Sequence, residues 1–334
     1  MLGVLPDGDA IVAQASSSLA LVQSRVGTWS GGSVRWFPAR PAALPHQAFA
    51  AAEARGTVVW RETPSTTLDV EPWRILATTL GSGTVRVVAL SSSLTGDDDV
   101  PPPPGVQVLA TDGVTAWWTA PYLDPTGYRG VATRVVGASV KSEKATPVVV
   151  ADHAYLPVVA GGQVVVLRSL VSDRASGGRF AFLAPLDGGG RVVHSGTLGE
   201  REAIWSACGS PRFLVYVISS GDLVNPGQPS EMAVESAQLH IRELSTGAET
   251  LIALQDSGKS LSLSCSDTLV AWGNGSSNGD PGQYVYDLHR HELYRLGEAA
   301  GRSVVFVADN VIAWSIAPAD PLAPTEYTIA RWGR

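Results

Sequence analysis

The stretch Ser266–Trp272 reads Ser-Asp-Thr-Leu-Val-Ala-Trp, and two close copies of it occur elsewhere in the chain. Thr111–Trp117 reads Thr-Asp-Gly-Val-Thr-Ala-Trp, and Ala308–Trp314 reads Ala-Asp-Asn-Val-Ile-Ala-Trp. Self-similarity of this kind is typical of repeat architectures. The three copies therefore indicate that the protein is built from repeated units.

Weaker copies extend the repeat along the chain. They end at Val22, Trp60, Pro157 and Tyr216, which makes seven anchor positions in all. Seven units share the 334 residues at about 48 residues each, a period in the range of four-stranded propeller blades. Short β-branched or aromatic segments bounded by turn residues fit such strands, and we find no capped amphipathic helix.

We predict an all-β fold, a β-propeller of four-stranded antiparallel blades. Seven blades fit the spacing best. Six is the alternative, if residues 1–42 only complete the last unit, which has three recognisable strands. We expect one domain over residues 1–334, with blades at approximately 1–42, 43–103, 104–146, 147–196, 197–257, 258–298 and 299–334.

The charge and composition of the chain limit the kinds of partner and location that we expect for it. A net charge of −7 argues against nucleic acid, whose partners carry basic surfaces. No apolar run reaches the eighteen residues that a membrane-spanning helix needs. Residues 1–7 lack the basic and long apolar regions of a signal peptide, so we expect any such peptide to lie outside this sequence. We expect a monomer.

Cys208 and Cys265 precede their anchors by similar distances, so both are expected in first strands of neighbouring blades. A disulfide between them is one interpretation, and it implies an oxidising compartment. The other is two buried thiols, which we favour because first strands splay apart and a disulfide needs Cα atoms within about 7 Å.

One face of the predicted propeller has long connections, those between strands two and three and those between blades. Thirteen acids against two bases, Arg61 and Arg174, fall in these connections. The acids are Glu62, Asp69, Glu71, Asp97, Asp98, Asp99, Asp124, Asp173, Asp222, Glu231, Glu235, Asp280 and Asp320. Such a face attracts cations or basic groups. The alternative is that these loops are polar only for solubility.

We select eight residues of this long-loop face as candidate binding residues. The acids are Asp97, Asp98, Asp124, Asp222 and Asp280, and the aromatic residues Trp73, Trp118 and Tyr122 are candidates for stacking on a ligand. The repeated Asp of the anchor phrase is expected instead in a turn on the opposite face, satisfying backbone groups.

Known catalytic and cofactor motifs are missing from the sequence. It has no Gly-x-Ser-x-Gly elbow, phosphate-binding loop, His-Glu-x-x-His or Cys-x-x-Cys. Asp97–Asp99 lacks the alternating spacing and distal Glu of a calcium loop. We therefore expect no cofactor, a calcium ion in the channel being the alternative without sequence support. The six histidines are scattered, and we read those on strands as packing residues.

The chain resembles the bacterial TolB-like and WD40-like propellers. The resemblance rests on Val-Ala-Trp after an Asp turn at 267–272, Tyr-Val-Tyr-Asp-Leu at 284–288 and Leu-Tyr-Arg-Leu at 293–296. It is best over 258–334 and 104–146. The chain lacks the Gly-His and Trp-Asp pair of WD repeats, and Leu5–Gly8 does not match the usual Ser-Pro-Asp-Gly turn because Asp9 follows.

The resemblance implies a recognition or scaffolding module located outside the cytoplasm: periplasmic, secreted or surface-anchored. We expect a non-catalytic propeller that recognises a protein, peptide or glycan, with basic groups favoured, through the long-loop face. The alternative is an extracytoplasmic propeller hydrolase or lyase with a metal or carboxylate site at the channel mouth.

Overall fold

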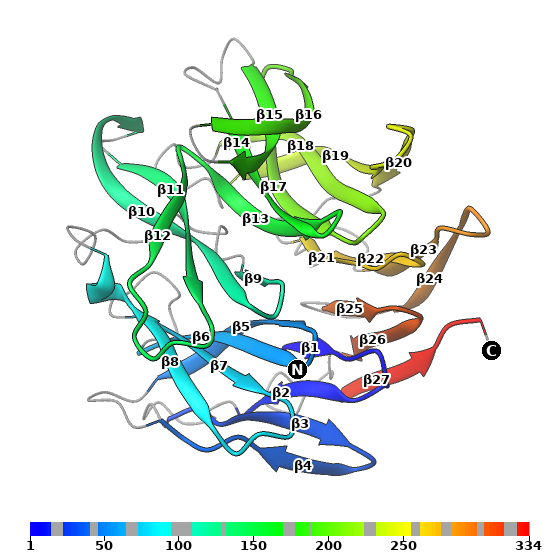
Figure 1. Ribbon diagram of the computed structural model, residues 1–334. Helices are drawn as coiled ribbons and strands as arrows, with labels where there is room; N and C mark the ends of the chain where they lie inside the picture. Colours follow the sequence, from blue (N-terminus) through cyan, green and yellow to red (C-terminus); the bar gives the residue numbers. More distant parts are fainter. Residues whose placement is uncertain are drawn as a thin grey trace.

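The computed structural model describes residues 1–14, 23–40, 46–64, 73–94, 109–128, 131–169, 178–186, 189–223, 232–254, 261–274, 282–298, 304–316 and 326–333. Seven antiparallel sheets surround a common axis as the blades of a propeller (Figure 1). In the described residues the only helical segment is a 3₁₀ turn at Ser91–Ser93. The prediction of an all-β propeller with seven blades is confirmed.

The strands follow the chain from the axis outward within each blade. Blades 1 and 2 contain β1 Gly3–Val4, β2 Ala10–Ala13, β3 Val26–Ser30, β4 Ser33–Trp36, β5 Gln47–Ala54, β6 Thr57–Thr63, β7 Arg74–Thr79 and β8 Val85–Leu90. Blades 3 and 4 contain β9 Leu109–Thr111, β10 Thr115–Tyr128, β11 Val131–Ser139, β12 Val148–Asp152, β13 Tyr155–Ala160, β14 Gln163–Ser169, β15 Gly178–Leu186 and β16 Gly189–Leu198. Blades 5 to 7 contain β17 Glu202–Gly209, β18 Phe213–Leu223, β19 Met232–Glu243, β20 Glu249–Leu254, β21 Leu261–Cys265, β22 Leu269–Asn274, β23 Gly282–Asp287, β24 Glu292–Glu298, β25 Val305–Ala308, β26 Val311–Ile316 and β27 Glu326–Arg331.

The core lies between the faces of neighbouring blades. Alternating side chains of each strand point to opposite faces of its sheet, so each blade contributes apolar residues to two interfaces. Trp272 of β22 packs with blade 5, for example, while its neighbour Ala271 packs with blade 7. The anchor residues Trp60, Trp117 and Trp272 are buried in this way between blades, and Trp314 is partly buried against the core.

In the described residues, the first and last blades meet through side-chain contacts. Among the described residues, blade 7 has three strands, and none of them pairs with a strand of blade 1. Closure comes from side chains: Val4 packs against Val311 and Ala313, and the Arg331 Nη2 donates a hydrogen bond to the Asp7 carbonyl at 2.7 Å. In Figure 1 the first strands, in blue, lie beside the last, in red.

A disulfide and hydroxyl hydrogen bonds join blades 5, 6 and 7. Cys208 of β17 and Cys265 of β21 form a disulfide between blades 5 and 6, with their Cα atoms 5.9 Å apart. The preference for two free thiols was therefore wrong, because these first strands approach closely enough at this level of the axis. Between blades 6 and 7, the Ser264 hydroxyl bonds both the carbonyl and the amide of Val307.

One anchor position and one boundary predicted from the sequence are wrong. Pro157 lies in β13, the first strand of blade 4, and not in a second strand. The second strand, β14, follows Gly161 and Gly162, whose positive φ angles make the turn that Asp makes elsewhere. The boundary at residue 146 fails as well, because β12 pairs with β11 and belongs to blade 3.

Blade 1 has its second strand earlier in the chain than the repeat predicted. Its second strand is β2, whereas the predicted anchor Val22 lies outside the described residues. Leu5–Gly8 does form the turn before it: the Gly8 N–H donates to the Leu5 carbonyl at 3.0 Å, and the Asp9 N–H donates to the Asp7 carboxylate at 3.0 Å. An Asp-Gly pair with Gly8 at φ 100° is a strong turn signal whatever follows it.

Candidate functional site

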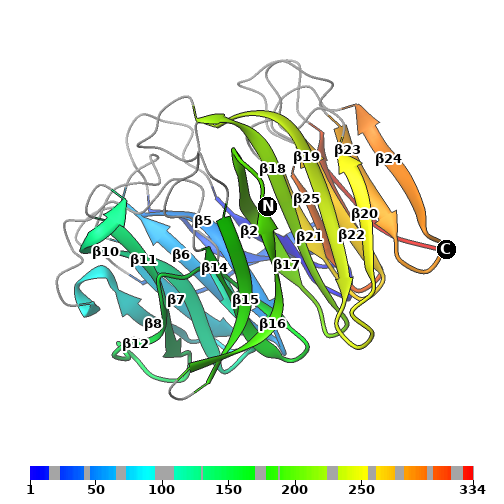
Figure 2. The same cartoon turned by 90° about the horizontal axis from the view of Figure 1, so that it is seen from above.

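The strands run between two faces of the ring (Figure 2). Because neighbouring strands are antiparallel, the second and fourth strands of the blades end on one face, as predicted, and the first and third strands end on the other, where the described hairpin turns lie. The repeated Asp has the predicted turn role on the hairpin face: the Asp112 carboxylate accepts hydrogen bonds from the amides of Val114 and Thr115, both at 2.8 Å.

On the long-loop face, Tyr122 and Asp124 meet a histidine that the sequence-based selection did not include. His153 stands in the connection from β12 to β13, and its Nε2 lies 3.3 Å from Oδ2 of Asp124 and 3.4 Å from the Tyr122 hydroxyl. The Asp124 side chain is 16% exposed and that of His153 is 51% exposed. A carboxylate held near a solvent-facing imidazole is an arrangement suited to proton transfer.

The residues around Tyr122, Asp124 and His153 affect the protonation of Tyr122, and the backbone of His153 has an unusual conformation. Burial raises the pKa of Tyr122, and the nearby carboxylates of Asp152 and Asp124 raise it further, so the phenol keeps its proton at neutral pH. The Arg134 guanidinium lies over the Tyr122 ring, 5.0 Å from its centroid. His153 itself has φ 50°, a conformation that costs energy for a residue with a side chain. Such strain is frequent at functional sites.

Nothing near His153 in the sequence indicates this group. Its partners Tyr122 and Asp124 come from the far end of β10, and the three residues meet because β12, the fourth strand of blade 3, pairs with β11, which in turn pairs with β10. A short tertiary contact of this kind has no periodic or motif signature.

The two tryptophans selected for stacking are buried. Trp73 and Trp118 are 3% and 1% exposed, and their rings meet edge to face with centroids 5.8 Å apart in the core between blades 2 and 3. Their positions at the ends of strands suggested exposure, but both side chains point between the sheets. Among the selected aromatic residues, only Tyr122 reaches the surface group.

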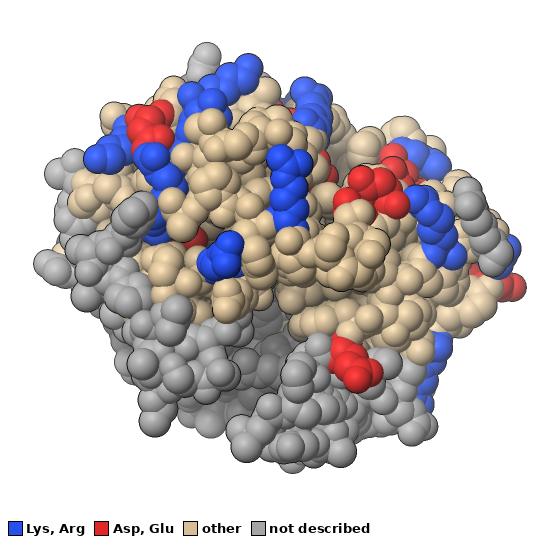
Figure 3. Space-filling model, turned by 90° about the horizontal axis from the view of Figure 1, so that it is seen from below, with Lys and Arg blue, Asp and Glu red and all other residues tan. Residues whose placement is uncertain are grey.

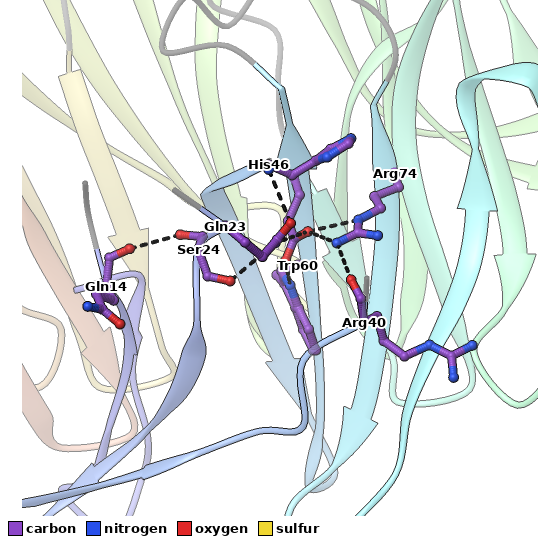
Figure 4. A network of polar contacts seen from close by, with 8 residues as sticks. Gln14, Gln23, Ser24, Arg40, His46, Trp60 and Arg74 are labelled. Carbon is purple, nitrogen blue, oxygen red and sulfur yellow. Dashed lines mark hydrogen bonds and ion pairs between the residues drawn. The ribbon is translucent and has the colours of Figure 1, made fainter. Parts of the chain in front are cut away.

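Two charged residues of the predicted acid-rich face are also buried. The Glu62 carboxylate receives Nε and Nη2 of Arg74 at 2.8 and 2.7 Å and the Trp60 indole N–H at 2.8 Å. Arg74 also donates to the Arg40 carbonyl at 2.8 Å, and Figure 4 shows this network joining blade 2 to the segment that leads into it. Arg61 lies 5.2 Å from the Trp73 ring centroid. Glu62 is therefore a structural residue that a solvated ligand does not reach.

The remaining candidates are not brought together by the described structure. Asp97, Asp98 and Asp280 lie outside the described residues, and Asp222 lies in β18, with its side chain also outside them. Within the described ranges, no group of three or more His, Cys, Asp or Glu side chains is arranged to hold a metal ion. The described surface in Figure 3 carries Lys and Arg spread among a few isolated groups of Asp and Glu.

A separate hollow of about 390 Å³ opens between blades 1 and 2 on the hairpin face. Its lining includes the charged residues Asp7, Asp9 and Arg35 and the apolar residues Leu5 and Phe37. It has the size of a small-molecule site, but it lies on the face opposite the Asp124–His153 pair. No helix in the described part of the chain is long and apolar enough to cross a membrane.

Comparisons with known proteins support the fold. No family model matches the chain, and no curated protein matches it in sequence. Among solved structures, a puromycin-hydrolyzing peptidase of Mycobacterium tuberculosis has a TM-score of 0.59 at 14% identity, covering 99% of this chain and 51% of its own. TolB from Acinetobacter baumannii gives 0.53 at 11% identity, covering 88% of this chain and 65% of its own. An oligogalacturonate lyase in complex with manganese gives 0.55 at 10% identity, covering 99% and 88%.

These neighbours correct the predicted function and support the TolB-like resemblance in part. Prolyl endopeptidases and an acylaminoacyl peptidase are also similar, so the neighbours are mainly enzymes. They contradict the expected non-catalytic binding propeller and agree better with its alternative, a propeller hydrolase or lyase. The chain spans about half the length of the peptidases it matches. At these identities the likeness establishes the fold alone: the chain is a seven-bladed β-propeller, similar in structure to TolB and to several peptidases.

Proposed function

We propose that this chain is the propeller of a hydrolase that acts on peptides, and that the long-loop face around His153 contacts the bond to be cleaved. The observation that carries the proposal is the His153 imidazole, half exposed, with one nitrogen facing both Asp124 and Tyr122. Its peptidase neighbours support the substrate class, and the excess of acids in the long connections favours substrates with a free amino group.

In the proposed reaction, His153 acts as the general base. It takes a proton from a water molecule whose oxygen attacks the acyl carbon, and it returns the proton to the departing amine, so that the peptide bond is replaced by an acid and an amine. The Asp124 carboxylate stabilises the imidazolium that forms in between. Tyr122, protonated at neutral pH, donates a hydrogen bond to the oxygen that gains negative charge.

A panel of peptide amides tests this proposal. The purified chain is incubated with aminoacyl, acylaminoacyl and prolyl derivatives of a fluorogenic amine, and the released amine is measured. We expect release from at least one substrate with a free amino terminus, and release that falls by at least about a hundredfold in Asp124→Asn with His153→Gln. Absence of release from every substrate, at enzyme concentrations that would reveal slow turnover, would overturn the proposal.

We also propose that the protein works outside the cytoplasm. The Cys208–Cys265 disulfide supports this location, because structural disulfides persist in oxidising compartments and are rare in the cytosol. Expression with and without export to the periplasm tests it. Thiol titration should find both cysteines oxidised and the protein soluble only after export, whereas equal yield and two free thiols in a stable cytosolic protein would contradict it.

A further inference from the structure

A line of hydrogen bonds crosses the outer part of the seam between blades 4 and 5. Nε2 of His194, on β16, lies 2.8 Å from the Tyr216 hydroxyl on β18. That hydroxyl donates to Oε1 of Glu249 on β20 at 2.8 Å, and the same oxygen lies 3.2 Å from Nδ1 of His240 on β19. We call these four residues the relay. It joins the outermost strand of blade 4 to three strands of blade 5.

The proton positions in the relay follow from the chemistry of its members. A tyrosine hydroxyl has one proton, and here it goes to Glu249, so the proton between His194 and Tyr216 belongs to the histidine Nε2. A neutral His194 supplies that proton. A second proton on its ring would leave these bonds in place and add a positive charge to a side chain that is only 12% exposed.

Charges and rings around His194 disfavour that second proton. Burial lowers the pKa of His194, and Arg242 and His240 on β19 lower it further, while Glu249 partly opposes them. From β15, Phe180 and Phe182 contribute uncharged rings. The ring centroid of Phe180 lies 5.6 Å from that of His194, and the ring centroid of Phe182 lies 5.1 Å from that of Tyr216.

The other two members of this chain of hydrogen bonds also have shifted pKa values. Burial and the hydrogen bond to Glu249 raise the pKa of Tyr216. Burial alone would raise the pKa of Glu249, but hydrogen bonds from Tyr216 and His240 bring it below its usual value.

His240 adds a second constraint. With Nδ1 on Glu249, its Nε2 is buried without a hydrogen-bond partner among the described residues. Its ring is stacked on Tyr216 with centroids 4.7 Å apart. A second proton on His194 would therefore place a charge beside this packed pair of rings, with the His194 and Tyr216 centroids 5.6 Å apart.

The inner part of the same seam is held by groups that do not titrate. The Gly161 amide donates to the Ser210 carbonyl at 3.0 Å. Gly209 approaches Val159 so closely that a Cβ on it would lie 2.3 Å from the Val159 carbonyl oxygen. Acidification thus acts on the outer strands and leaves the inner ones joined.

We propose that the relay is an acid-sensitive latch: when His194 gains its second proton, the outer strands of blades 4 and 5 separate while their inner strands stay together. The direction of the pH dependence follows from the difference in proton binding between the closed and the open seam. His194 binds a proton more weakly in the closed seam than in the open one, so the seam is fully closed above the free histidine pKa of about 6.5 and opens as the pH falls below it. The inference goes beyond the proposed hydrolase and does not depend on it.

Hydrogen exchange of the full chain tests the latch. Protection factors, corrected for intrinsic exchange at each pH, are compared at about pH 7.5 and pH 5 by mass spectrometry. We expect protection of β16, β19 and β20 to fall between the two pH values, because the closed seam binds the second proton of His194 more weakly than the open one. The seam between β21 and β25, which hydroxyls of Ser262 and Ser264 join, should stay unchanged.

Variants separate the latch from general acid sensitivity. His194→Gln keeps a donor for the Tyr216 hydroxyl and cannot titrate, so it should abolish the pH dependence. Tyr216→Phe removes the relay and should give low protection of the three strands at both pH values. The exposed His289→Gln is the matched control and should behave as the parent protein. Equal loss of protection in all blades, unchanged protection in acid, or full pH dependence in His194→Gln would each overturn the inference.

Discussion

Nε2 of His153 lies 3.3 Å from Oδ2 of Asp124, and this contact joins the end of the second strand of blade 3 to the connection that enters blade 4. It is the point on the long-loop face where the described structure brings a carboxylate and an imidazole together in reach of solvent. The proposed function depends on this pair, while the stability of the ring depends on other contacts that can be tested separately.

Breaking the buried ion pair of blade 2 should destabilise the protein strongly. The side chains of Glu62 and Arg74 are 4% and 5% exposed, so Arg74→Met leaves a buried carboxylate without its cation. We expect a loss of about 3–5 kcal/mol in the free energy of unfolding, measured with urea. Arg201 and Glu235 form an exposed pair, and Glu235→Gln should change stability by less than about 1 kcal/mol. Equal effects of the two changes would contradict the structural role of Glu62.

Removing the disulfide should destabilise the ring through the unfolded state. Cys208 and Cys265 close a loop with a sequence separation of 57 residues, for which the chain-entropy relation gives about 4 kcal/mol. The double change Cys208→Ser with Cys265→Ser should lower the free energy of unfolding by that amount, measured as a lower urea midpoint at unchanged m, and dithiothreitol should reproduce the loss in the parent protein. Dithiothreitol should have no effect on the double variant. An unchanged midpoint after confirmed reduction would show that packing alone holds blades 5 and 6.

Glu53 should destabilise the protein at neutral pH. Burial raises the pKa of Glu53, and the carboxylates of Asp7 in blade 1 and Asp309 in blade 7 raise it further, against the Gly56 amide, which donates a hydrogen bond to it. A raised pKa in the folded state means that ionisation of this carboxyl opposes folding above its unfolded pKa. Glu53→Gln should therefore raise the Tm near pH 7.5, and the gain should vanish near pH 4. Glu326→Gln, on an exposed site, is the control; a gain independent of pH would contradict the electrostatic cause.

Much of the fold was predictable from the sequence, because the Ala-Trp phrase places a turn before a buried second strand. Trp117, Trp272 and Trp314 all lie in second strands. The repeated sequence did not locate the second strand of blade 4, because Gly161 and Gly162 make the turn there in place of Asp. A turn can be made by any residues with suitable backbone angles, so the repeat in structure is more regular than the repeat in sequence.

The site was less predictable, for two physical reasons. Exposure was inferred from position near strand ends, but Trp118 is buried because the period of two along β10 points it between blades. Partners were inferred from loop membership, but His153 reaches Asp124 through the return of β12 beside β11. The local sequence pattern therefore predicted the face and two of its residues, Tyr122 and Asp124. The third residue, His153, could be found only from the long-range strand pairing.

The value of kcat/KM for the best peptide amide, compared between His153→Gln and the matched His289→Gln, tests the central claim most directly. His153 is the proposed base, so its replacement should lower kcat/KM by about 10²–10⁴. His289 is an exposed histidine in the β23–β24 hairpin, so its replacement should leave kcat/KM within about twofold, as surface changes away from a site usually do. Equal kcat/KM values in the two variants would contradict the assignment of hydrolysis to the His153 site.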